Sequence, residues 1–149
     1  MASSSKAAAG RAAPAASTRL AALTVAVVED AENIRQRLIQ LVTEVARMRV
    51  VGEAATEETA IAICREHAPE ALILDMQLAS GSGLGVLKAM NYASMAARPA
   101  IIVLTNFPSP AVERAARELG AEWFLDKSSE FEKLPRLLQT VADRRRALP

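Results

Sequence analysis

The feature that most constrains the fold is a set of short apolar runs, each ending abruptly in a charged or hydroxylated residue. They are Leu23 to Val28 before Glu29 and Asp30, Ala71 to Leu74 before Asp75, Ala100 to Leu104 before Thr105, and Trp123 to Asp126 before Lys127. A continuous apolar run this short is typical of a strand that is buried on both faces, as in a parallel sheet. The chain is therefore expected to build its core around buried strands with polar tips.

Amphipathic segments lie between these runs. From Ile34 to Val45, apolar residues recur at spacings of three and four, which predicts a helix with one apolar face. Further helices are expected from Thr56 towards His67, around Leu84 to Met90, from Pro110 to Leu119, and from about Glu132 onwards. Thr56 and Ser109 are suited to cap two of these helices at the N-terminus, and Gly120 is suited to end one.

One further strand, from Val50 to Ala54, completes a series of five strand and helix repeats. Repeats with short links require parallel strands joined by right-handed crossovers. The predicted fold is therefore α/β, a doubly wound five-stranded parallel sheet with helices on both faces. A chain of 149 residues that is 51% hydrophobic and 23% charged suits one such compact domain.

The opening segment has a different composition from the rest. Residues 1–20 are rich in Ala and Ser, and we expect a disordered tail ahead of one domain over residues 21–149. The tail lacks the long apolar stretch of a secretory or membrane segment, although a transit peptide would also be Ser-rich and poor in acids. Because Lys6, Arg11 and Arg19 lie in it, the remainder is slightly acidic, which argues against direct nucleic acid binding. Cys64 is the one cysteine, which fits a reducing compartment, so we expect a cytoplasmic protein. Because the sequence shows no long apolar stretch, we expect no membrane partner.

Polar residues at the strand ends form the candidate site. Parallel strands place their carboxyl ends at one edge of the sheet, so Glu29, Asp30, Asp75, Thr105 and Lys127 should gather there. Three carboxylates in one place repel one another unless a cation neutralises them, and an all-oxygen ligand set favours Mg²⁺. Asp75 is the candidate nucleophile, because a carboxylate can form an aspartyl phosphate. Glu29 and Asp30 would hold the metal, while Lys127 and Thr105 would contact the phosphoryl oxygens.

The fragments at the strand ends, taken in order, resemble a known family. They are Val-Val-Glu-Asp at 27–30, Leu-Ile-Leu-Asp at 72–75, Val-Leu-Thr at 103–105 and Phe-Leu-Asp-Lys at 124–127, with Gly83 eight residues beyond Asp75. In this combination the chain resembles a response-regulator receiver domain from about Leu23 to Arg146. The resemblance implies a flavodoxin-like strand order of 2-1-3-4-5 and Mg²⁺-dependent transfer of a phosphoryl group to Asp75 from a sensor-kinase phosphohistidine. It also implies that the main-chain carbonyl of Gln77 completes the metal shell.

The resemblance further implies a conformational switch and a set of partners. Thr105 would move towards the phosphoryl group while Phe124 turns inward, although burial preferences also suit Phe124 to a purely structural place in the core. The altered surface would comprise the fourth helix, the fifth strand and the last helix. The implied partners are a sensor histidine kinase or phosphotransfer protein, a downstream protein target, and a second copy through that surface. The chain would be a regulator rather than an enzyme, apart from a part in its own phosphorylation and dephosphorylation.

Three positions depart from the family pattern. Ala79 stands where proline is frequent, Asn106 where alanine is commoner, and Ser128 where proline often follows the lysine. A cis peptide at Ser128 is not expected, because a non-proline cis bond costs roughly 2.5–4 kcal/mol. Gln77 and Asn106 occupy positions that tune hydrolysis of the aspartyl phosphate, so its lifetime does not follow from the sequence. The residues after Lys127 are enough for one helix and too few for a DNA-binding domain, which favours a stand-alone receiver.

Three other functions match parts of the pattern. A flavodoxin-like FMN binder would use the same edge of the sheet, but Glu29 and Asp30 would repel the phosphate, and the purified protein would be yellow. An aspartyl-nucleophile phosphohydrolase needs a second acid just beyond Asp75, where Gln77 stands, and would turn over many phosphoesters. A receiver-like module that binds partners without phosphorylation would keep the same residues, and the sequence leaves it open.

Overall fold

The computed structural model describes residues 22–147, with side chains as far as residue 145, so the predicted tail over residues 1–20 lies outside it. One sheet of five parallel strands has the predicted order β2-β1-β3-β4-β5. The strands are β1 (Leu23–Val28), β2 (Met48–Ala54), β3 (Ala71–Leu74), β4 (Ala100–Thr105) and β5 (Trp123–Asp126). All five predicted strands are confirmed, and β2 begins slightly earlier than predicted.

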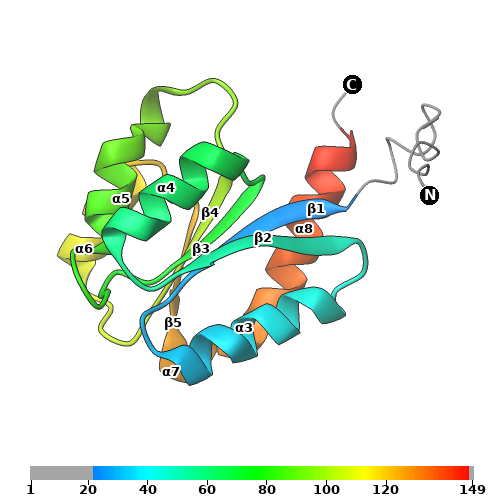
Figure 1. Cartoon of the computed structure of the whole chain (residues 1–149), viewed down its shortest axis with the longest axis horizontal. Coiled ribbons are helices and arrows are strands. Elements are labelled where there is room, and N and C mark those ends of the chain that lie inside the picture. The colour runs from blue at the N-terminus through cyan, green and yellow to red at the C-terminus, as the bar shows by residue number, and fades with distance from the viewer. Residues whose placement is uncertain (1–21, 148–149) are drawn as a thin grey trace, which may run out of the picture.

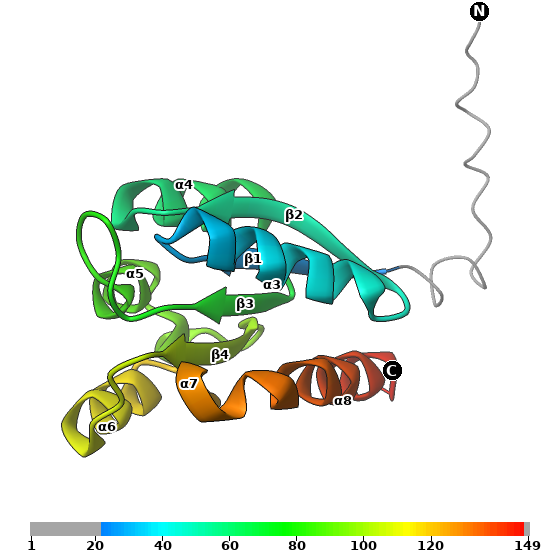
Figure 2. The same cartoon turned by 90° about the horizontal axis from the view of Figure 1, so that it is seen from below.

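Helices cover both faces of the sheet, as predicted. They are α3 (Glu32–Glu44), α4 (Glu57–His67), α5 (Gly83–Met90), α6 (Pro110–Glu118), α7 (Lys127–Glu130) and α8 (Leu134–Ala147), with 3-10 turns η1 (Tyr92–Ser94) and η2 (Phe131–Lys133). Figures 1 and 2 show α3 and α8 over one face, and α4, α5 and α6 over the other. Within residues 22–147, no helix combines the length and the apolarity that a membrane crossing needs.

The core consists of two apolar layers, one on each side of the sheet. Successive strand residues point to opposite faces, so Val27 packs towards α3 and α8 while Val28 packs towards α4, α5 and α6. All four residues of β3 and all six of β4 are buried. The continuous apolar runs of the sequence therefore correspond to the central strands of a sheet that is covered on both faces.

The predicted helix caps are confirmed. The Thr56 side chain accepts a hydrogen bond from Thr59 N (3.2 Å), and Ser109 Oγ accepts one from Val112 N (3.1 Å). Gly120 follows the end of α6 with a φ of +114°, a conformation that residues with a Cβ rarely adopt. These local signals were readable in the sequence because each cap involves neighbouring residues only.

The last part of the chain differs from the prediction in detail. The final helix, expected from about Glu132, begins at Leu134, so that Pro135 lies in its first turn, where a missing N–H is tolerated. The unpredicted helix α7 and turn η2 fill the interval from β5. Peptide bonds among the described residues are all trans, including the one before Ser128, as expected.

Candidate functional site

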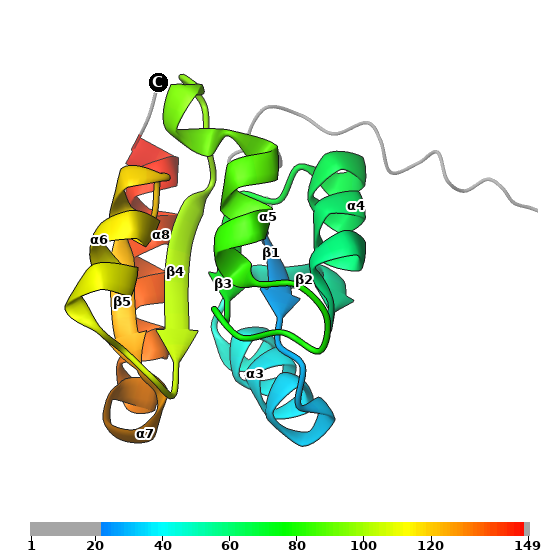
Figure 3. The same cartoon turned by 90° about the vertical axis from the view of Figure 1, so that its left-hand side faces the viewer.

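The predicted site residues gather at the edge of the sheet where the strands end. Figure 3 shows β1 and β4 pointing towards this edge, with α7 beyond the end of β5. Glu29, Asp75 and Thr105 are 1%, 5% and 1% exposed. With the amphipathic Tyr92 and Cys64 set aside, they are the polar residues within 22–145 that are buried as whole residues, main chain included. Burial of polar groups is costly, so their concentration at one edge marks a site rather than packing.

Lys127 joins two of the carboxylates. Its Nζ donates a hydrogen bond to Glu29 Oε1 (2.6 Å) and another to Asp75 Oδ2 (2.9 Å), and all three side chains are more than nine-tenths buried. Ion pairs of this kind contribute little net stability, because the desolvation cost is comparable with the attraction. The arrangement therefore adds little to the stability of the fold, and it places an ammonium group beside Asp75.

The protonation of Lys127 follows from its neighbours. Burial lowers its pKa, but the hydrogen bonds to Asp75 and Glu29 and the negative charges of these two residues together outweigh burial, so the pKa lies above the usual value and the side chain is an ammonium group. For Glu29, burial raises the pKa, while the Lys127 bond and a bond from Ala31 N to Oε2 (3.0 Å) act against it. Each Glu29 carboxylate oxygen thus has one protein donor.

A short helix that the sequence analysis missed positions Lys127. Lys127 is the first residue of α7, and Asp126 caps that helix by accepting hydrogen bonds from Ser128 N (2.9 Å) and Ser128 Oγ (2.7 Å). These bonds lower the pKa of Asp126. In return, Asp126 N donates to Glu130 Oε1 (2.8 Å). The N–H of Ser128 that makes this cap would be absent in the proline that often occupies this position in the family the chain resembles.

The three carboxylates form a candidate metal centre. One oxygen from each of Glu29, Asp30 and Asp75 lies within 4.8 Å of the others. Asp30 is exposed and, among the described residues, has no hydrogen-bond or ion-pair partner. Among the described residues, Lys127 is the one cation bonded to these carboxylates, so the cluster keeps an excess of negative charge. An oxygen-only site with a free carboxylate fits Mg²⁺, which takes one or two carboxylates and keeps several waters.

The loop after Asp75 is fastened to the start of α4. Gln77 N donates to Asp75 Oδ1 (3.2 Å), and Gln77 forms an isolated antiparallel bridge with Ser82. Ser82 N in turn donates to Glu57 Oε1 (2.9 Å), while Glu57 N donates to Ser80 O (2.9 Å). Glu57 is therefore linked through Ser82 to Gln77, whose main-chain carbonyl is expected to bind the metal. The sequence analysis did not predict this role for Glu57, because its partner Ser82 lies 25 residues away along the chain.

The predicted switch residues lie on neighbouring strands. Thr105 Oγ1 accepts a hydrogen bond from Phe107 N (3.4 Å), and the residue pairs with Asp126 across β4 and β5. Phe124 is half-buried and packs against the apolar layer under α4, α5 and α6. These positions allow the expected switch, but that of Phe124 also suits a purely structural role. The movement of Thr105 and the inward turn of Phe124 therefore stay predictions.

Comparisons with known proteins agree with this geometry. The profile of the response regulator receiver domain matches residues 25–139. The nitrate/nitrite response regulator protein NarL of Escherichia coli strain K12 is 27% identical over 119 residues, which is 80% of this chain and 54% of that protein. The response regulator UvrY of the same strain is 27% identical over 120 residues, with the same shares. The chain thus spans about half the length of these curated relatives.

Solved structures share the fold at low identity. A two-component response regulator of the LuxR family from Aurantimonas sp. SI85-9A1 matches with a TM-score of 0.73 and 23% identity, over 83% of this chain and 86% of that one. The response regulator domain of Thermotoga maritima CheB matches with a TM-score of 0.71 and 21% identity, over 86% and 98%. At these identities the likeness establishes the fold alone.

Proposed function

Because the chain belongs to the response regulator receiver domain family, we propose that it is a phosphoacceptor switch of a two-component system, with Asp75 as the acceptor. The donor would be a phosphohistidine on a sensor histidine kinase or a phosphotransfer protein. The observation that carries the proposal is the contact of Lys127 Nζ with Asp75 Oδ2 (2.9 Å) inside a buried acidic cluster. A regulator of this kind carries a signal and is not a classical enzyme.

The proposed reaction is a direct phosphoryl transfer. A carboxylate oxygen of Asp75 attacks phosphorus, the bond between phosphorus and the imidazole nitrogen breaks, and that nitrogen keeps the electron pair. The Lys127 ammonium, already paired with Asp75 Oδ2, offsets negative charge on the phosphoryl oxygens. The Thr105 hydroxyl, on the neighbouring strand, donates a hydrogen bond to one of them. Asp75 is only 5% exposed, so few waters compete for the phosphorus.

Mg²⁺ is the proposed cofactor. Asp75 would bind it, Glu29 and Asp30 would hold it directly or through water, and Gln77 would contribute its main-chain carbonyl. A bound Mg²⁺ would neutralise charge that builds up between the carboxylates and the incoming phosphoryl group. The support is the excess negative charge of the cluster and the unpaired carboxylate of Asp30.

Signalling would pass through another protein. Thr105 and Phe124 lie on β4 and β5, next to the surface of α6, β5 and α8, which we propose to change on phosphorylation and to bind a downstream target or a second copy. Cys64 is a free thiol, which suits the reducing cytoplasm that we propose for the protein.

The test is mass spectrometry of the chain with Mg²⁺ and acetyl phosphate. The wild type should gain one acid-labile phosphoryl group, and Asp75→Asn should gain none while its circular dichroism stays unchanged. Asp143→Asn on α8 is the matched control and should label like the wild type. Equal labelling of Asp75→Asn would refute the acceptor assignment. An unlabelled wild type that still binds its partner would instead favour a module that works without phosphorylation.

A further inference from the structure

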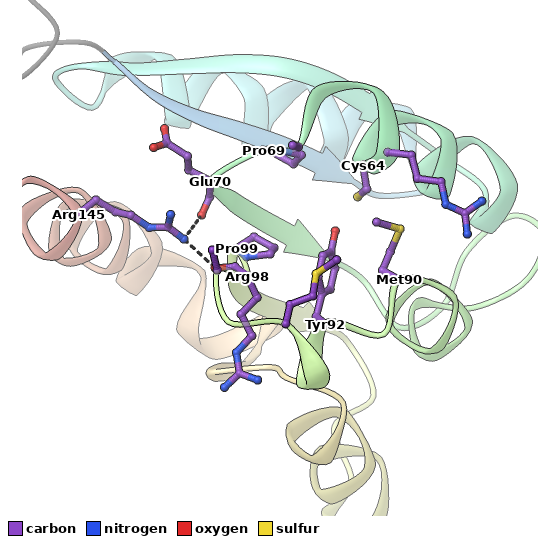
Figure 4. Close-up of a pocket in the computed structure, with 12 residues that line it drawn as sticks. Cys64, Pro69, Glu70, Met90, Tyr92, Arg98, Pro99 and Arg145 are labelled. Atoms are coloured by element: carbon purple, nitrogen blue, oxygen red, sulfur yellow. Dashed lines mark hydrogen bonds between the residues drawn. The ribbon is translucent and has the colours of Figure 1, made fainter. Parts of the chain in front are cut away.

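A cavity lies at the opposite edge of the sheet from the acidic cluster, where β3 and β4 begin (Figure 4). Its volume is about 360 Å³. The ends of α4 and α5, the turn η1, the segment before β4, and Arg145 of α8 line it. Small-molecule sites typically measure roughly 300–1,000 Å³, so the cavity is large enough for a small organic ligand.

The walls of the cavity are mainly apolar. Met90, Met95, Tyr92, Pro69 and Pro99 supply much of the lining. Met95 is 44% exposed and is one of the two large hydrophobic side chains that the described chain leaves exposed. A flexible, polarizable methionine at the mouth adapts readily to an apolar or aromatic body. The cavity therefore favours a ligand whose main part is apolar.

One arginine, Arg145, gives the cavity a positive charge. Arg145 Nη2 donates to Glu70 O (3.1 Å) and to Arg98 O (2.9 Å), which holds the guanidinium at the cavity, as Figure 4 shows. Both bonds use Nη2, so Nε and Nη1 have no acceptor among the described residues. Arg65 also lines the cavity, but it lines the neighbouring pocket beside Glu57 and Glu58 as well, so it is not counted as part of the anion site.

Within the lining of the cavity, no carboxylate neutralises Arg145. Glu70 is the one acidic residue of the lining, and its carboxylate oxygen Oε1 accepts hydrogen bonds from Thr24 N (3.0 Å) and Thr24 Oγ1 (3.4 Å). In Figure 4 that carboxylate points away from the cavity, as does the guanidinium of Arg98, which we therefore leave out of the charge count. The site thus combines an apolar interior with donors that lack an anionic partner.

We propose that this cavity binds a small amphipathic anion, with an apolar or aromatic body against Met90, Tyr92 and Met95 and an anionic head at Arg145. A carboxylate, sulfonate or phosphate head satisfies the free guanidinium donors, and Arg is suited to such planar or oxyanion groups. A cavity of this volume suits a compact ligand better than the broad surface of a protein. The proposal does not depend on phosphorylation of Asp75, which lies at the other end of β3.

The test uses 8-anilino-1-naphthalenesulfonate, an aromatic body with a sulfonate head, and its neutral analogue N-phenyl-1-naphthylamine. It is done on the full chain without Mg²⁺ or a phosphoryl donor, so its result is independent of the proposed function. Saturable binding of the anionic dye should be tighter than that of the neutral one. Arg145→Gln should weaken it about two- to fivefold, as loss of a partly exposed charge contact does. Ala97→Phe, which places a ring in the lining, should abolish it.

Two matched control variants and the positions of the amide shifts show whether the dye binds in the cavity. Arg49→Gln and Ala111→Phe make the same exchanges at exposed positions away from the cavity and should bind like the wild type. Amide shifts caused by the dye should gather in residues 64–70 and 90–99. Equal affinity for the two dyes, wild-type binding by Ala97→Phe, or shifts gathered elsewhere would overturn the proposal. A wild-type dimer that Ala97→Phe converts to a monomer would overturn it too, since a second copy would then occupy the cavity.

Discussion

Replacing Gly85 by alanine tests whether Glu57 fastens the loop that follows Asp75. Gly85 lies in the first turn of α5, and a Cβ there would overlap Oε1 and Cδ of Glu57. The carboxylate would have to leave, and its hydrogen bond from Ser82 N would be lost. That bond involves a charged acceptor and is worth about 1.5–3 kcal/mol. Alanine regains at most about 1 kcal/mol over glycine in a helix.

The lost hydrogen bond destabilises the protein and the gain in helix propensity stabilises it, and the lost hydrogen bond is the larger contribution. In the wild-type background, Gly85→Ala should lower the free energy of unfolding by about 0.5–2 kcal/mol. In a Glu57→Ala background, where the carboxylate is already gone, the same substitution should be neutral or stabilising by up to about 1 kcal/mol. The sign of the effect therefore depends on a residue in another helix.

The assay is urea unfolding of the four proteins of this double-mutant cycle, which isolates the coupling between the two positions. Glu58→Ala replaces the neighbouring acid in the same helical turn and is the matched background, in which Gly85→Ala should behave as in the wild type. If Gly85→Ala lowers the free energy of unfolding equally in the wild-type and Glu57→Ala backgrounds, the hydrogen bond from Ser82 N to Glu57 does not contribute as proposed.

Three further predictions concern Lys127, its helix and the buried thiol. Lys127→Ala should still accept some phosphoryl groups but fail to change the surface around α6, β5 and α8, and amide spectra that match phosphorylated wild type would contradict this. Asp126→Ala should lower the midpoint of thermal or urea unfolding, because the N-cap of α7 is lost, whereas Glu118→Ala at an exposed position should not. Burial raises the pKa of the Cys64 thiol, against a smaller lowering by its bond with Tyr92, so less thiolate is present near pH 8 than in an unfolded chain. Iodoacetamide should therefore react slowly with native Cys64 and faster in urea, and equal rates would contradict the burial argument.

The sheet could be predicted from the sequence because its signals are local. A buried parallel strand is apolar on both faces, so runs such as Ala71 to Leu74 stand out without knowledge of their neighbours. The caps at Thr56 and Ser109 involve side chains and N–H groups three residues apart. The helix α7 escaped prediction because its four residues carry no periodic pattern, and its order depends on hydrogen bonds among Asp126, Ser128 and Glu130.

The sequence alone determined which polar residues share one edge of the sheet. The carboxyl ends of parallel strands meet at one edge, so the residue that follows each strand in the chain lies there, whatever the positions of the helices. The tertiary structure decided what those side chains do to one another. Lys127 is 98 residues from Glu29 and 52 from Asp75, and only packing brings its Nζ between them. The same holds for Glu57, whose partner Ser82 is 25 residues away. Side-chain direction depends on every neighbour that surrounds it, and those neighbours come from distant parts of the chain.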